Sequence, residues 1–322
     1  MTIPRLQMNL PGKLRQILRT ALLGPLVPSQ AFDFSLNAPQ TEVAVWLHGI
    51  GAPRDVTGCH SVACPVPFML CVGCEEQEPE LPSHNHRASL KFSERGGEKR
   101  LLGEIKLQQQ TVFLTSGPRL HLYKATACTN FCLPRLRRWT RSLYAARAHW
   151  KNRGSGRIEV SSLDGRCNEI IFSCPRPVVL VSALEGDRGN LFPMNLMGPV
   201  GREYFVFALN SKNHAAPLVG QTASLALSTI PFDQAEQVRQ LGKNHHVSSV
   251  NWSQLPFDTH LSRTLQIPVP EFALTVREMK IEQSYPLGSH TFFIARVVDR
   301  TLYSNAPEFH RIHGLYARLR KA

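Results

Sequence analysis

The chain lacks the hydrophobic segments that carry a protein into or through a membrane. No run of about 18 apolar residues occurs in its 322 residues, so we expect no membrane-spanning helix. The first residues include only a short apolar stretch, Ala21-Leu22-Leu23, without the apolar region and cleavage site of a secretory signal. We therefore expect a cytoplasmic protein whose eight cysteines are reduced thiols.

The sequence also lacks the alternation of strands and long helices that builds a parallel sheet. From residue 157 onward, short β-rich runs follow one another and are separated by turns, as at 177–183, 204–209, 223–230, 274–281 and 290–298. This arrangement favours an antiparallel barrel. We predict a mainly β protein, with an N-terminal α+β accessory domain at 1–156 and a barrel domain at 157–322. No repeat of fixed period is visible.

Acidic residues are scarce, above all in the first half of the chain. Residues 1–160 hold 21 Lys and Arg against 11 Asp and Glu, and the whole chain holds 37 against 24. Most of the basic excess therefore lies in the first half. Residues 134–153 contain basic side chains and no acid, and Leu136, Trp139 and Leu143 are spaced three or four apart. This pattern predicts a basic amphipathic helix. Packing of its apolar stripe on its own domain is favoured. A peripheral contact with an anionic surface is the alternative, and nucleic acid is disfavoured.

Neither a catalytic triad nor a pair of catalytic carboxylates is evident, and no metal site is predicted. Cys71 and Cys74 have the spacing of zinc ligands, but they close a strongly apolar strand, which favours buried, inert thiols. His310 and His313 are three residues apart, and we expect them at the surface or in dimer packing.

The polar residues best suited to a phosphate follow an apolar strand. Ser211-Lys212-Asn213-His214 brings hydroxyl, ammonium and amide donors together at the end of that strand. Upstream, residues 190–199 form a compact stretch rich in Met and Pro, which can supply a flat apolar wall for a planar ring.

These segments are parts of a larger resemblance. Pro175-Arg176-Pro177, the stretch Asn190–Asn195, Ser211–His214 and Gly288-Ser289-His290 occur in this order. Together they resemble the flavin reductase-like family, an FMN-binding split β-barrel, over about residues 173–317. Each motif alone is weak, whereas the four in order are fairly specific.

The resemblance implies a homodimer that binds FMN, or FAD, at the subunit interface. It implies that Asn190, Pro193, Met194, Asn195 and Leu196 line the flavin ring. It also implies that Ser211, Lys212 and His214, with Asn213 in the same loop, hold the flavin phosphate. Gly288, Ser289 and His290 would lie near the ring, where relatives admit a nicotinamide. No catalytic side chain is assigned with certainty, because hydride passes between the two cofactors and the protein supplies stacking and polarity.

Three positions depart from the family's usual residues. Asn195 stands for a serine, His214 for a threonine and Ser289 for an aspartate. Each replacement keeps a hydrogen-bond donor, so flavin binding is expected to survive, while use of NADH or NADPH has less support.

We therefore expect a flavin-dependent oxidoreductase that exchanges hydride or electrons with a nicotinamide nucleotide or a redox protein partner. The alternative is a non-catalytic flavin-binding module, which the basic N-terminal domain tethers to a partner or an anionic surface.

Overall fold

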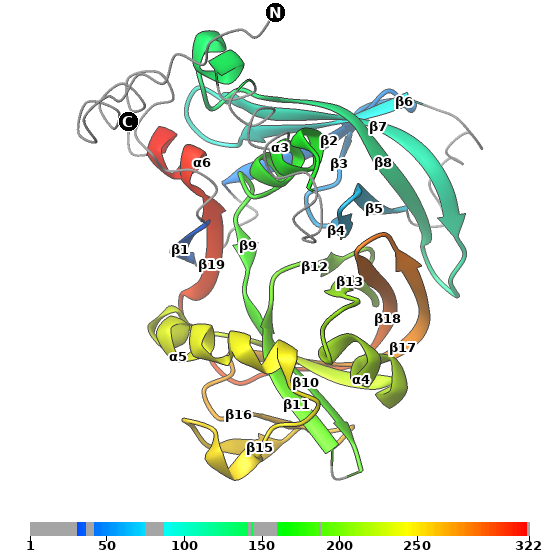
Figure 1. The fold of residues 1–322 in the computed structure, drawn as a ribbon, viewed down its shortest axis with the longest axis vertical. Helices are drawn as coiled ribbons and strands as arrows, with labels where there is room; N and C mark the ends of the chain where they lie inside the picture. Colours follow the sequence, from blue (N-terminus) through cyan, green and yellow to red (C-terminus); the bar gives the residue numbers. More distant parts are fainter. Residues whose placement is uncertain are drawn as a thin grey trace, which may run out of the picture.

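The computed structural model describes residues 31–36, 42–74, 87–140, 143, 160–186 and 188–320. Most of the secondary structure within these residues is antiparallel β-sheet, and two seven-stranded sheets dominate (Figure 1). The predicted mainly β class is therefore confirmed. The eight cysteines all lie in described residues, and none of them is in a disulfide. Among the described residues, no helix is both long enough and apolar enough to cross a bilayer.

The C-terminal sheet is built from residues 179–302. Its strands lie in the order β11-β10-β14-β17-β18-β13-β12, and every pairing is antiparallel. Their bounds are β10 (Val179–Glu185), β11 (Arg188–Met194), β12 (Met197–Pro199), β13 (Tyr204–Asn210), β14 (Ser224–Thr229), β17 (Thr275–Leu287) and β18 (His290–Leu302). Helix α4 (Ala215–Thr222) joins β13 to β14 and packs Leu218 and Val219 into the same core as Phe207 and Phe293. The core therefore lies between the curved sheet and this helix.

The N-terminal sheet is built from residues 43–130. Its strands lie in the order β3-β2-β6-β7-β8-β5-β4. Their bounds are β2 (Val43–His48), β3 (Arg54–Asp55), β4 (His60–Pro65), β5 (Phe68–Cys74), β6 (Arg87–Glu94), β7 (Leu101–Phe113) and β8 (Arg119–Asn130). Two helices from later in the chain, α3 (Ser162–Ile171) and α6 (Gly314–Leu319), complete its core with Ile170, Ile171 and Tyr316.

The two sheets have the same strand order. When the strands are counted from the first one in each sheet, both sheets have the order 2-1-5-6-7-4-3. The long sixth and seventh strands form a hairpin in both sheets, β7 with β8 and β17 with β18. The N-terminal half is thus not merely β-rich, because it repeats the topology of the C-terminal half without a visible repeat in the sequence.

Smaller elements connect the two sheets and extend the C-terminal one. Strand β19 (Glu308–His313) lies between β1 (Ala31–Leu36) and β9 (Arg176–Pro177), so segments from both ends of the chain share one small sheet. A two-stranded sheet and four short helical segments fill residues 232–270: β15 (Thr259–Leu261), β16 (Pro268–Pro270), α5 (Ala235–Gln240), η2 (Phe232–Gln234), η3 (Leu241–His246) and η4 (Trp252–Gln254).

The sheets contact each other through matching parts. The tip of the β17–β18 hairpin lies on the β4–β5 turn, where Ser289 N donates to Val66 O at 2.9 Å. The tip of the β7–β8 hairpin lies on the β12–β13 turn, where Ser116 Oγ and Tyr204 Oη are 2.6 Å apart. Between these contacts a shared apolar cluster joins the sheets: Ala63, Cys71, Leu120 and Leu122 from the first, with Val200, Tyr204, Val206, Phe292 and Ile294 from the second.

The basic helix predicted at 134–153 lies largely outside the described residues, but its first turns are helical at 135–140. There, Leu136 is 73% exposed and Trp139 is 63% exposed. The expected packing of these two side chains on their own domain is therefore wrong. The core of the N-terminal sheet is already completed by α3 and α6.

Close approach of the two sheets depends on glycine at position 73. A Cβ added there would lie 2.1 Å from the carbonyl oxygen of Val200, which is backbone and cannot rotate away. We expect Gly73→Ala to lower the free energy of unfolding by about 1–3 kcal/mol, as overpacking does in closely packed interiors. Denaturant unfolding measures the change. Gly58→Ala is the control, because a Cβ there meets nothing within 4 Å. Equal stability of the two variants would contradict this account of the interface.

Candidate functional site

The predicted phosphate loop and the Gly288–His290 motif lie side by side. Strands β13 and β18 pair so that Asn210 is opposite His290. Beyond that pair, Ser211 N donates to Ser289 O at 3.2 Å, and Ser211 Oγ lies 3.1 Å from Thr291 Oγ1. Two motifs separated by more than 70 residues in sequence thus form one polar surface.

Helix α4 begins directly after the phosphate loop. His214 is its N-cap residue, and no side chain caps the helix there. Ser211, Lys212 and His214 are exposed beside this helix end. In the first turn of α4, Ala216 N donates to Asn213 O at 3.3 Å and Pro217 has no N–H, so the attraction for an anion comes from the helix dipole and the nearby ammonium group. This end of the sheet is therefore suited to an oxoanion.

The Gly288–His290 turn is held against the N-terminal half. Gly288 has a φ of +52°, and a Cβ there would lie 2.4 Å from Pro67 Cδ. Ser289 Oγ lies 2.8 Å from His290 Nδ1, and burial lowers the pKa of His290 to about 4. His290 is therefore neutral at neutral pH and can donate or accept one hydrogen bond at each ring nitrogen according to its tautomer.

Several side chains of the stretch 190–196, which were expected to line the flavin ring, pack or bond within the protein. Asn190 is fully buried, and its Nδ2 donates to Asn244 O and Val247 O, both at 2.9 Å. The side chain of Met194 belongs to the C-terminal core, and Leu196 packs against the N-terminal core. Pro193 O lies 2.8 Å from His245 Nε2. Asn195 and Leu196 form the half-buried link between β11 and β12.

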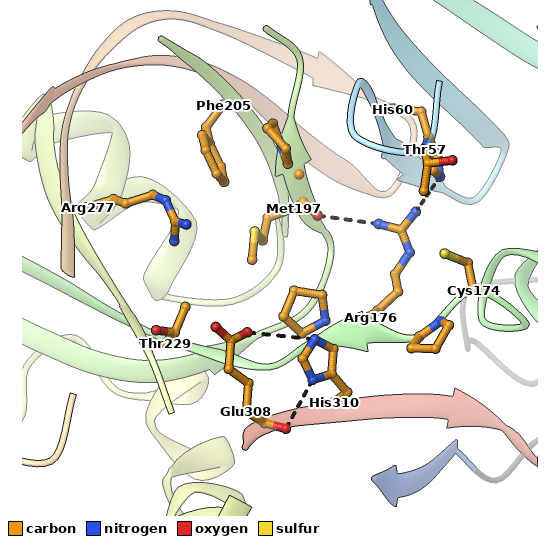
Figure 2. A pocket seen from close by; sticks show the side chains of 14 residues that line it. Thr57, His60, Cys174, Arg176, Met197, Phe205, Thr229, Arg277, Glu308 and His310 are labelled. Atoms are coloured by element: carbon orange, nitrogen blue, oxygen red, sulfur yellow. Dashed lines mark hydrogen bonds and ion pairs between the residues drawn. The ribbon is translucent and has the colours of Figure 1, made fainter. Parts of the chain in front are cut away.

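A cavity of about 300 Å³ lies where the two sheets and β19 meet (Figure 2). Thr57 and His60 reach it from the N-terminal half, whereas its remaining lining comes from residues 174–310. The Pro175-Arg176-Pro177 motif forms part of the wall. None of the residues predicted to hold a flavin lines it.

Arg176 is the central side chain of this wall. It is 5% exposed, and its guanidinium donates to Met197 O at 3.3 Å and to His60 Nε2 at 3.2 Å. His60 Nδ1 in turn donates to Val56 O at 2.7 Å. Burial, together with the nearby Arg176 charge, lowers the pKa of His60 to about 3, so the ring is neutral and its Nε2 accepts.

A second set of charged and titratable groups lines the same cavity, and two of them lie on β19, which pairs with the strand that carries Arg176. Arg277 reaches in from β17, with its guanidinium carbon 5.5 Å from the centre of the Phe205 ring. Glu308 and His310 come from β19, and burial raises the pKa of the Glu308 carboxyl. Burial also lowers the pKa of His310 to about 4.

Sequence reasoning missed this cavity, because its residues converge from seven separate segments. The sequence singled out some of these residues, in the Pro175-Arg176-Pro177 motif, in the stretch 190–199 and at His310, but gave no sign that they line one cavity. His310 and His313 were expected at the surface or in dimer packing. This expectation is wrong, because His310 is 0% exposed and His313 is 5% exposed within the chain itself. The pairing of β19 with both β1 and β9 buries them.

The cysteines show no sign of a metal centre. No group of three or more His, Cys, Asp or Glu side chains suited to a metal ion occurs within the part of the chain that the structure describes. Cys71 is fully buried, and burial raises the pKa of its thiol.

Comparison with known proteins gives the family of the C-terminal half. Residues 171–318 match the family model of the flavin reductase like domain. An FMN-binding protein of Thermus thermophilus is 24% identical, with 40% of this chain and 72% of that chain covered and a TM-score of 0.35. An NADH:FAD oxidoreductase of Streptomyces globisporus is 18% identical, with 46% and 88% covered and a TM-score of 0.41.

The flavin reductase component of a bacterial two-component tryptophan halogenase is 15% identical, with 46% of this chain and 97% of that chain covered and a TM-score of 0.41. A search of curated proteins found no match. The family match confirms the resemblance found in the sequence, and its bounds lie within a few residues of those expected.

Proposed function

Because residues 171–318 form a flavin reductase-like domain, we propose that this protein binds FMN and passes hydride or electrons between that flavin and a nicotinamide nucleotide or redox protein. The observation that carries the proposal is the junction of two motifs beside the N-terminus of α4, which no side chain caps. Ser211 bonds to both Ser289 and Thr291, directly before the N-terminus of α4. Flavin binding has the stronger support, and reductase activity follows from the family alone.

The loop and the helix end would hold the flavin phosphate. Lys212 supplies a charge and three N–H donors, Ser211 and Asn213 supply neutral donors, and His214 supplies a ring N–H. FAD is the alternative flavin, because the same contacts serve its phosphate. When bound, the flavin supplies the hydride chemistry.

The remaining predicted residues would shape the ring site. Neutral His290 with Ser289 would give a polar edge without a positive charge. Asn195 and Leu196 would line the ring from the β11–β12 link, and NADH or NADPH would enter beside His290.

A second candidate is a flavin-binding module without catalysis, tethered by its N-terminal half. The exposed Leu136 and Trp139 between Arg135, Arg137 and Arg138 favour it, because this combination suits an anionic surface.

The spectrum of the purified protein tests the proposed function. We expect a flavin absorbance at about 450 nm, either as isolated or after addition of FMN, which NADH or NADPH bleaches without oxygen. A yellow protein that neither nucleotide reduces would favour the binding module or reduction by another protein. A colourless protein that does not take up FMN would exclude both candidates.

Lys212→Ala tests the phosphate assignment. Loss of a charged donor is expected to weaken FMN binding by about 1.5–3 kcal/mol, because a hydrogen bond to a charged group contributes about that much. Fluorescence titration measures the affinity, with the exposed Lys280→Ala as the control. Riboflavin, which has no phosphate, should bind the variant and the parent protein equally. An equal loss for riboflavin would show that Lys212 does not contact the phosphate.

A further inference from the structure

A buried arginine in the cavity wall has no carboxylate to balance its charge. The Nε of Arg176 has no hydrogen-bond partner, and both other nitrogens bond to neutral groups, Met197 O and the His60 ring. Cys174 does not compensate it either, because burial raises the pKa of that thiol to about 11. An uncompensated buried charge is strongly destabilising, and an anion in the adjacent cavity would relieve the cost.

A second guanidinium lies on the other side of the same cavity. In Figure 2, Arg277 points from β17 toward Met197, while Arg176 reaches up between Met197 and His60. Within the described residues, Arg277 has a ring contact with Phe205 and no ion pair within 4 Å. Glu308 is the one carboxylate among the described lining residues; burial raises its pKa, while the charges of Arg277 and Arg300 act in the opposite direction. Two guanidinium groups thus face one carboxylate. The cavity is therefore electropositive.

Much of the remaining lining is apolar, beside the hydroxyl groups of Thr57 and Thr229 and the rings of His60 and His310. Pro175, Pro177 and Pro199, with Met197 and Phe205, surround a space of about 300 Å³. This volume is at the lower end of the range for small-molecule sites, which are mostly apolar with a few convergent polar groups. The lining thus matches a compact apolar body with a single anionic group.

We propose that this cavity binds a small organic oxoanion, a carboxylate or a phosphate on a compact ring, with Arg176 and Arg277 as its two cationic contacts. The cavity shares no residue with the proposed flavin site, although Met197 of its lining directly follows Leu196 of the proposed ring site, and the separation is largest at the phosphate end. Phe205 lies near the start of β13 and Ser211 follows its end, so the cavity and the phosphate end are roughly 20 Å apart along an extended strand.

Titration calorimetry on the flavin-free protein tests the proposal with benzoate, phenyl phosphate and inorganic phosphate, and with benzyl alcohol as the neutral control. We expect benzoate or phenyl phosphate to bind and Arg176→Met to weaken that binding about 10- to 100-fold, since a charge-assisted bond is lost. The exposed Arg188→Met is the matched control and should bind like the parent. Benzoate binding alone identifies a carboxylate, and phosphate binding identifies a phosphoryl group.

The unliganded stability separates this role from a structural one. A ligand-binding Arg176 is an unpaired buried charge, so Arg176→Met should unfold at the same temperature as the parent or higher. If Arg176 only joins the two halves, the variant unfolds earlier and no probe binds, which overturns the proposal. Binding unchanged in both Arg176→Met and Arg277→Met overturns it as well, as does displacement of the probe by FMN. Because these titrations need no flavin, failure of the proposed function would not affect them.

A second inference rests on the repeated topology. The two sheets have one strand order, and each places its long hairpin on the turn between the third and fourth strands of the other. Such reciprocal contacts are the signature of an isologous, two-fold interface. Here both partners lie in one chain.

The two halves differ where a phosphate would bind. The loop after β13 is Ser211-Lys212-Asn213-His214, whereas β5, its counterpart, is followed by Glu75 and Glu76. The N-terminal half therefore repeats the strand order of the C-terminal half without the Ser-Lys-Asn-His sequence after the matching strand.

We infer that the N-terminal half takes the place of a second subunit, so that the protein is a monomer with a single flavin site per chain. Light scattering during size exclusion should give about 36 kDa, the mass of one chain. A mass of twice that value at micromolar concentration would overturn the inference and support the homodimer expected from the sequence. The flavin count rests on the proposed function and should be one per chain, and two per chain would contradict it.

Discussion

The structure depends on how two edge strands cover each other. Strand β4 ends the order of the N-terminal sheet and β12 ends that of the C-terminal sheet, and the two strands are in contact. An exposed edge would offer unpaired backbone groups to other chains. Contact this close requires glycine, since a Cβ at Gly198 would lie 2.9 Å from the backbone oxygen of His60. The β7–β8 and β17–β18 hairpins and the cavity beside Arg176 lie around this contact between the edge strands.

The sequence predicted the features that depend on local pattern. Short β-rich runs without long helices gave the mainly β class, and four ordered motifs gave the family of residues 171–318. The motif at Ser211 and the motif at Gly288 do lie together, because β13 pairs with β18. Motifs survive in a sequence because each requires particular side chains at fixed spacing.

The features that depend on long-range topology could not be predicted from the sequence. Alternating apolar residues specify a strand and its buried face but not its neighbour, so the N-terminal half gave no sign of repeating the second barrel. Its loops differ from those of the C-terminal half, and an acidic segment follows β5 where α4 follows β13. The exposed Leu136 and Trp139 show the same limit, because a helical stripe predicts an apolar face without saying what covers it.

The position of Arg176 shows why the N-terminal half matters for the chemistry of the cavity as well as for the stability of the fold. This residue lies in a motif of the C-terminal domain, yet one of its two polar contacts is His60, which begins β4. A neutral imidazole is a suitable neighbour, because it accepts a hydrogen bond from the guanidinium and leaves the positive charge uncompensated. A carboxylate at position 60 would neutralise Arg176 and remove the attraction for an anion. The N-terminal half thus orients the arginine while keeping its charge available to the cavity.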